Sequence, residues 1–288
     1  MAVPMGFYTD TTVCIGCKAC EVACHQWNQL PAANGGVNTL SGDSYDNTRR
    51  LDGINWRHVK FVEQFPARGQ GSGAGGQATG ASSAQSPAPS PSTPGRWLLM
   101  SDVCKHCVQA GCLEVCPTGA IVRTEFDTVV IQENVCNGCR NCLAGCPFGV
   151  IGINPVTNTA QKCTLCYDRM LNGLTPACAQ ACPTASIQFG TIADLRQRAT
   201  ARVQQLRSQG VEAYLYGADE KMLGGLNSFY LLIDRPEVYG LPANPRLPSR
   251  NLWPASGLSA AGALGVGLLG LVAFRLRRMG YIAGEEEE

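Results

Sequence analysis

Sixteen cysteines in four sets of four constrain the fold of this chain more than any other feature of its sequence. Each set begins with a CxxC pair and ends with a CxxxC pair, and a proline follows the last cysteine in three of the four sets. The sets are Cys14, Cys17, Cys20 and Cys24; Cys104, Cys107, Cys112 and Cys116; Cys136, Cys139, Cys142 and Cys146; and Cys163, Cys166, Cys178 and Cys182. They include every cysteine, so none remains for a disulfide or a nucleophile.

The set from Cys136 to Pro147 has the spacing CxxCxxCxxxCP of bacterial-type ferredoxins. In that motif three thiolates hold one 4Fe–4S cube and the fourth ligates a second cube. Thiolates are soft ligands that suit such clusters, and Gly138 permits a tight turn between them. A zinc ribbon has two well-separated CxxC pairs instead. Sixteen ligands at four per cube therefore predict four 4Fe–4S clusters.

Exchange of the fourth cysteine between paired sets predicts which thiolates share a cube. We expect the second and third sets to pair because they are neighbours in one short stretch, and the first and fourth sets to pair across it. The predicted groups are Cys14, Cys17, Cys20 and Cys182; Cys24, Cys163, Cys166 and Cys178; Cys104, Cys107, Cys112 and Cys146; and Cys116, Cys136, Cys139 and Cys142.

This pairing predicts an α+β fold of two bacterial-ferredoxin-like double 4Fe–4S domains, one nested in the other, plus one C-terminal transmembrane helix. The expected segments are 1–66 with 157–190 (outer domain), 96–156 (nested domain), 67–95 (flexible low-complexity insertion), 191–250 (C-terminal extension), 251–274 (transmembrane helix) and 275–288 (charged tail). Residues 67–95 are mostly small, Gln and Pro residues that cannot bury a core. A tolerated surface insertion is favoured there over a segment that orders on a partner.

Hydrophobic periodicity predicts the elements around the cysteines. The expected strands are 7–10, 56–65 with Val59 and Phe61 on one face, 97–100, 120–122, 129–131 and 228–233. A short helix is expected at 20–27, and 236–248 is expected to be irregular. A longer helix is expected from its N-cap Thr191 to Gly210, with Ile192, Leu195, Ala199, Val203 and Leu206 on its apolar face.

Residues 251–274 contain no charged side chain. As a helix they would extend about 36 Å, enough to cross a hydrocarbon core about 30 Å thick. Trp253 lies at one edge and Arg275, Arg277 and Arg278 lie at the other, so a span is favoured over a buried helix of a soluble domain. The same arginines favour a cytoplasmic C-terminus, with a cytoplasmic-face complex as the alternative. Small residues at four-residue spacing, such as Gly257, suit packing against another membrane helix.

Composition excludes some functions and indicates how the chain folds. A net charge of +1 gives no support for nucleic-acid binding. With 33 Gly and 17 Pro residues, the chain is rich in loops and its cores are small. We therefore expect the clusters to supply much of the folding free energy and the iron-free chain to be largely unfolded. Residues 1–10 contain no export signal.

Nothing in the sequence predicts catalysis by this chain alone. It has no phosphate-binding glycine loop, and each of its histidines (His25, His58 and His106) is interpreted as a local hydrogen-bonding residue. The span has neither His nor Cys, so no haem is expected, and neither is a flavin or a pterin. Lys18 and Lys162 lie beside cluster cysteines, as do Lys105 and Arg140. Such cations either raise cluster reduction potentials or are simply solvated.

With its four cysteine sets and single span, the sequence resembles the iron–sulfur (β) subunit of membrane-bound formate dehydrogenase. The likeness is strongest in Cys-Ile-Gly-Cys-Lys-Ala-Cys at 14–20, Lys-Cys-Thr-Leu-Cys-Tyr-Asp-Arg at 162–169 and Tyr-Gly-Leu-Pro at 239–242, and residues 67–95 depart from it. The cysteine sets alone are shared with subunits of dimethyl sulfoxide, polysulfide and nitrate reductases and of some hydrogenases.

The resemblance implies a non-catalytic electron-transfer subunit. Electrons would arrive from a molybdenum or tungsten pterin catalytic subunit and leave to an integral membrane subunit that reduces quinone. The ferredoxin domains would face the periplasm, co-exported with a signal-bearing partner. The alternative of a different class is a free polyferredoxin tethered to the membrane.

Overall fold

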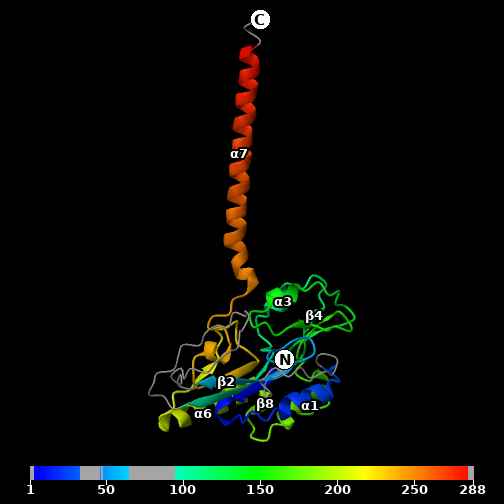
Figure 1. Ribbon diagram of the computed structural model, residues 1–288, viewed down its shortest axis with the longest axis vertical. Helices are drawn as coiled ribbons and strands as arrows, with labels where there is room; N and C mark the ends of the chain where they lie inside the picture. Colours follow the sequence, from blue (N-terminus) through cyan, green and yellow to red (C-terminus); the bar gives the residue numbers. More distant parts are fainter. Residues whose placement is uncertain (1–2, 33–45, 47, 65–94, 285–288) are drawn as a thin grey trace, which may run out of the picture. The chain divides into compact units, whose positions relative to one another are not determined.

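The computed structural model describes residues 3–32, 46, 48–64 and 95–284. Two compact units, Met1–Arg246 and Leu247–Glu288, make up the chain. Figure 1 shows their helices and strands. Most of the predicted insertion, Phe65 and the glutamates of the tail lie outside the described residues.

A four-stranded sheet forms the base of the first unit. Its strands are β1 (Met5–Asp10), β8 (Ile187–Thr191), β9 (Tyr214–Tyr216) and β10 (Ser228–Leu232), in the order β8-β1-β10-β9. β1 is antiparallel to β8 and parallel to β10. Every residue of β10 is buried, so the predicted strand at 228–233 is confirmed as part of the core. The segment predicted as a C-terminal extension therefore supplies two strands of this sheet.

Helix α6 (Ile192–Ser208) packs on β1 and β8 and confirms the amphipathic helix. All five predicted apolar positions are buried. The Thr191 hydroxyl accepts a hydrogen bond from the Asp194 amide at 3.2 Å, as the capping pattern predicts. The helix ends at Ser208, two residues before Gly210, which takes a φ of +78° in the turn that follows.

Strands β2 (Arg57–Gln64) and β3 (Arg96–Val103) form an antiparallel pair on either side of the low-complexity segment. Their register runs from Arg57 opposite Val103 to Gln64 opposite Arg96. The ends of the intervening segment are thus attached to directly paired residues, where a long connection disturbs no other strand. β3 begins the stretch predicted as the nested domain, yet it pairs with a strand of the outer segment.

The cysteine sets lie on loops and short helices around small two-stranded sheets. The sheets are β4 (Ile121–Arg123) with β5 (Val129–Ile131), as predicted, and β6 (Gly152–Ile153) with β7 (Ala160–Gln161). The helices are α1 (Ala19–Trp27), α2 (Gly111–Glu114), α3 (Asn141–Gly145), α4 (Tyr167–Leu171) and α5 (Ala177–Gln180). The 3₁₀ turns η1 (Thr11–Val13) and η3 (Pro236–Tyr239) complete the unit, and η3 lies in the stretch predicted as irregular.

A short helix begins near the third cysteine of each set, and its length depends on the residue that follows the fourth cysteine. α2, α3 and α5 each begin just before the third cysteine of a set and end before the fourth, which a proline follows. Proline lacks the amide that a continuing helix needs. In the first set His25 stands in that place, and α1 continues through Cys24 to Trp27.

The second unit contains the 3₁₀ turn η4 (Pro248–Asn251) and helix α7 (Leu252–Gly284). Its stretch Ser256–Arg278 has a mean hydropathy of 1.9 and is long and apolar enough to cross a membrane. Helix α7 continues beyond the predicted span of 251–274, since Arg275, Arg277 and Arg278 are helical, and the bounds of the span stay a prediction.

Candidate iron–sulfur centres

Each CxxC pair lies on a loop with the same backbone turn. The residue just before the second cysteine has a positive φ in every set: Gly16 (+68°), His106 (+43°), Gly138 (+70°) and Leu165 (+61°). This turn allows both cysteines of a pair to face one side. At Gly138 a Cβ atom would lie 2.5 Å from the Asn158 carbonyl oxygen, so glycine is needed there for space as well as conformation.

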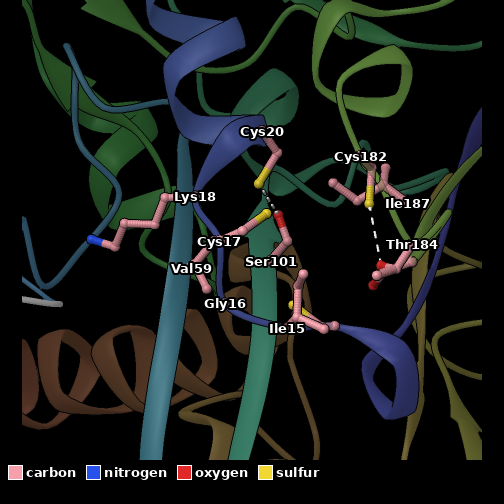
Figure 2. Close-up of a pocket in the computed structure, with 12 residues that line it drawn as sticks. Ile15, Gly16, Cys17, Lys18, Cys20, Val59, Ser101, Cys182, Thr184 and Ile187 are labelled. Carbon is pink, nitrogen blue, oxygen red and sulfur yellow. Dashed lines mark hydrogen bonds between the residues drawn. The ribbon is translucent and has the colours of Figure 1, made fainter.

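Cys14, Cys17, Cys20 and Cys182 line one cavity of about 290 Å³. Figure 2 shows Cys17 and Cys20 on one side of it and Cys182, from a distant part of the chain, on the other. The Cys20 sulfur lies 3.2 Å from the Ser101 hydroxyl and the Cys182 sulfur 3.8 Å from the Thr184 hydroxyl. The predicted first group of four therefore meets at one cavity.

Cys104, Cys107, Cys112 and Cys146 line a second cavity of about 330 Å³. Each cavity is thus lined by four cysteines, the number of ligands that one 4Fe–4S cube takes. The second predicted group also includes a cysteine from the neighbouring set, Cys146.

The remaining two groups are recognised by their mutual electrostatic effects. Burial raises the pKa of the Cys24 thiol well above its usual range, and Cys163, Cys178 and Cys166 raise it further. Burial likewise raises the pKa of Cys142 to about 11, with contributions from Cys136, Cys139 and Cys116. The structure brings the first two predicted groups together, each around its own cavity. The grouping of the other eight cysteines stays a prediction, which these effects support.

These thiols suit a multi-iron cluster better than a single ion. Within the described ranges, no three His, Cys, Asp or Glu side chains converge closely enough to hold one metal ion. Thiolates that each bind a different iron of a cube stand farther apart than the ligands of one zinc ion. Burial raises the pKa of Cys20, Cys112 and Cys163 to about 12, so without iron these thiols keep their protons at neutral pH.

The cations that the sequence singled out differ in their surroundings. The Lys18 side chain is 26% exposed, lies 3.6 Å from Glu21 and points away from the cavity in Figure 2. Lys162 is buried beside the second cavity, and its amine donates to the backbone oxygens of Cys163, at 3.1 Å, and Val129. Lys105 is buried in an ion pair with Asp102, whereas Arg140 is exposed.

Arg57 is a buried cation near the cysteines that the sequence reasoning missed. It lies on β2, far from any cysteine in the sequence, and only 4% of it is exposed. One signal was available, because Arg57 shares its strand face with Val59 and Phe61, the predicted inward face. An arginine on an inward face indicates a buried positive charge.

Two histidines hold local structure. The His106 Nδ1 accepts a hydrogen bond from the Val129 amide at 3.1 Å. His58 lies 3.4 Å from both Glu21 and Asp46 and 2.9 Å from the Thr48 hydroxyl. Both contacts fit the predicted role of a hydrogen-bonding residue.

Two family models described as 4Fe–4S dicluster domains match this chain, at residues 13–120 and 95–192. Two such domains correspond to four clusters, the number predicted from the cysteines. The formate dehydrogenase iron-sulfur subunit of Haemophilus influenzae is 37% identical over 85% of this chain and 70% of its own length. The formate dehydrogenase-O iron-sulfur subunit of Escherichia coli is 37% identical, over 83% and 71%.

A subunit of the anaerobic dimethyl sulfoxide reductase of Escherichia coli is a more distant relative, 30% identical over 69% of this chain and 78% of its own length. Iron–sulfur subunits of this kind transfer electrons within an enzyme complex and do not catalyse its reaction alone. On the cysteine geometry, the dicluster domains and the similarity over most of its length, the chain belongs to the family of formate dehydrogenase iron–sulfur subunits.

Proposed function

We propose that this chain carries electrons from a molybdenum or tungsten pterin subunit that oxidises formate to an integral membrane subunit that reduces quinone. The observation that carries this proposal is that cysteines from all four sets lie in one cluster of buried side chains. Bound cubes supply one-electron chemistry, and the chain holds them in place, excludes water and offsets their charge.

The proposed ligands are the four predicted groups. They are Cys14, Cys17, Cys20 and Cys182; Cys24, Cys163, Cys166 and Cys178; Cys104, Cys107, Cys112 and Cys146; and Cys116, Cys136, Cys139 and Cys142. The first two belong to the outer double-cluster domain and the last two to the nested one. We propose nested domains on this grouping of the ligands alone. The strands do not divide in the same way, because β2 of the outer segment pairs with β3 of the nested one.

Electrostatic effects between the groups support a single order. Burial raises the pKa of Cys20, and Cys178 adds to the rise, which supports neighbouring positions for the Cys14 and Cys24 groups. In the same way Cys104 acts on buried Cys163, and Cys142 acts on buried Cys112. The proposed order starts at the group of Cys14, continues through those of Cys24 and Cys104, and ends at that of Cys116. Cys17 and Cys139 in the two end groups are exposed, as entry and exit points require.

Buried Lys162 is the better candidate of the two lysines for setting a cluster potential. Reduction adds negative charge, and a cation in a low-dielectric interior favours it more strongly than a solvated one. Lys162 is 2% exposed and lies between the Cys104 cavity and Cys163. Lys18, partly exposed and near Glu21, is expected to have the smaller effect.

Helix α7 is proposed to anchor the chain in the cytoplasmic membrane as a single span. Its apolar stretch and the arginines at its end support the anchor. The proposed orientation leaves the C-terminus in the cytoplasm and the cluster domains on the periplasmic face. The relatives' names support a catalytic partner, and the small-residue face of 257–267 supports a membrane partner.

Mass spectrometry and metal analysis of the gently solubilised native complex test the proposal. The expected result is a large pterin-binding partner, molybdenum or tungsten, and about sixteen irons per copy of this chain beyond those of the partner. Recovery of this chain alone with its iron would instead support a tethered polyferredoxin. Reduction of the clusters by formate, or oxidation of the reduced clusters by dimethyl sulfoxide, would separate the two related enzyme classes.

A further inference from the structure

Arg57 is a buried cation for which the described residues supply no matching negative charge. Its Nη1 donates to the Ser101 hydroxyl at 3.1 Å, and its guanidinium lies 4.8 Å from the centre of the Phe7 ring. Its Nη2 is buried without a hydrogen-bond partner in the described part of the chain. Arginine stays protonated in proteins, and a buried charge without a partner is strongly destabilising. Some group that this protein binds therefore has to supply the negative charge.

The neighbours of Arg57 identify that group. Helix α1, which carries Cys20 and Cys24, packs against both β2 and the helix α5 that carries Cys178. Burial acts to lower the pKa of the Arg57 guanidinium, but Cys178, Cys20 and Cys163 outweigh it and raise that pKa. Cys20 belongs to the first cysteine group, whereas Cys178 and Cys163 belong to the group of Cys24. The Ser101 hydroxyl lies 3.1 Å from the Arg57 Nη1 and 3.2 Å from the Cys20 sulfur, so it links the guanidinium to the first group. Because α5 packs against α1, Cys178 of the second group lies on the helix beside Cys20. The guanidinium therefore lies near cysteines of both groups.

We propose that Arg57 is a shared counter-charge that raises the reduction potentials of the two cubes held by the Cys14 and Cys24 groups. This inference rests on the proposed ligation. A cube with four thiolates is an anion, and gaining one electron makes it more negative, so a fixed cation beside it favours reduction. Because Arg57 acts on both cubes, an electron that moves between them stays within the electrostatic field of the guanidinium. Arg57 therefore favours reduction of both cubes and does not oppose electron transfer between them.

The other buried cations among the described residues do not combine these features. Lys105 has Asp102 as an ion-pair partner. Arg169 donates to the Thr175 backbone oxygen at 2.6 Å and to the Gln180 side chain. Lys162 donates its hydrogen bonds to two backbone oxygens. Arg57 combines deep burial, an unpartnered nitrogen and thiolates from two groups.

Redox titrations of the native complex, followed by electron paramagnetic resonance, test the proposal through three variants. In Arg57→Gln we expect two of this chain's four midpoints to fall, each by at least the 59 mV that corresponds to a tenfold change in a one-electron equilibrium. In Arg57→Lys, which keeps the charge, we expect smaller shifts. Arg198→Gln, on an exposed position of α6, is the matched control and should move none.

Iron content separates failure of this inference from failure of the proposed function. If Arg57→Gln retains about sixteen irons, unchanged midpoint potentials overturn this inference but not the proposed function. Equal shifts in all four midpoint potentials, or equal effects of the Gln and Lys variants, have the same consequence. A wild-type chain without four cubes would overturn the proposed function instead.

A measurement on the wild-type complex does not depend on the variants folding. With arginine labelled with ¹⁵N only in its guanidinium group, pulsed electron–nuclear double resonance should detect nitrogen coupling in two of the four reduced clusters. Absence of coupling in all four would place Arg57 too far from any cube and overturn the inference.

Discussion

At the residue scale, single backbone and side-chain details decide whether a cysteine loop can hold its cube. Glycine fills the left-handed position in two of the loops, but His106 and Leu165 fill it in the others. A left-handed non-glycine residue costs about 1–2 kcal/mol, which the rest of the loop offsets. The sequence therefore indicated the turn at Gly138, whereas at His106 and Leu165 nothing in the residue type reveals it.

Replacing Gly138 should disrupt the cube held by the Cys136, Cys139 and Cys142 loop. In Gly138→Ala the new Cβ would meet the Asn158 carbonyl oxygen at 2.5 Å, in addition to the strain of a φ of +70°. We expect the loss of about four irons per chain, measured by metal analysis. Gly119→Ala is the control, since its φ is +67° but a Cβ there meets nothing within 4 Å. Equal iron in both variants would show that the close approach does not matter.

His58 should make stability depend on pH in the alkaline range. Burial acts to lower the pKa of its imidazole, but hydrogen bonding and charge from Asp46 and Glu21 outweigh this and raise the pKa from 6.5 to about 9. Because the folded pKa is the higher one, the contribution is complete below pH 6.5 and is lost as the pH rises through 9. It amounts to about 3 kcal/mol.

Denaturant unfolding of the iron-loaded protein between pH 6 and 10, followed by cluster absorbance, measures this effect. Stability should decline above about pH 6.5, and His58→Gln should remove most of that decline. A His58→Gln curve parallel to the wild-type curve would exclude the ion pair as its cause.

At the element scale, helices α1 and α6 could be predicted because their signals are local. The apolar face of α6 and its Thr191 cap follow from spacing alone, whereas the short helices α2, α3, α4 and α5 were not predicted. The packing of β1 beside β10 could not be predicted, because it joins residues more than two hundred positions apart. The inward direction of Arg57 was readable from strand alternation, but its neighbours depend on how α1 packs on β2 and α5.

Helix α6 should contribute to stability mainly through its buried face. Leu195 is fully buried against the sheet, so Leu195→Ala should cost about 2–5 kcal/mol of unfolding free energy. Thr191→Ala, which removes the cap, should cost about 1 kcal/mol. The exposed change Arg198→Ala should cost almost nothing. Denaturant unfolding compares the three, and a Leu195→Ala cost as small as that of Arg198→Ala would contradict the packing described for α6.

At the scale of the whole molecule, the cysteines are part of the core. The main cluster of buried side chains includes Cys20, Cys104, Cys142, Cys163 and Cys178. Iron–sulfur cubes would thus replace much of the apolar packing that a chain of this size ordinarily has. The sequence predicted the number of clusters, because ligand spacing is a local signal, whereas the grouping of ligands from distant sets stays a prediction. The order of the groups required the three-dimensional arrangement.

Complete removal of iron should therefore unfold the first unit. Without the cubes the buried thiols enclose empty cavities and Arg57 loses its proposed counter-charge. We expect circular dichroism of the chelated protein to show loss of most strand signal and no cooperative thermal transition. A native-like cooperative melt of the iron-free chain would show that the protein fold does not depend on the cubes.

Rapid freeze-quench electron paramagnetic resonance of the native complex tests most directly whether electrons pass through this chain between formate and quinone. Formate alone should reduce the clusters of this chain, and added quinone should reoxidise them at least as fast as the complex turns over. Clusters that stay oxidised while formate is consumed, or that stay reduced when quinone is added, would contradict this role.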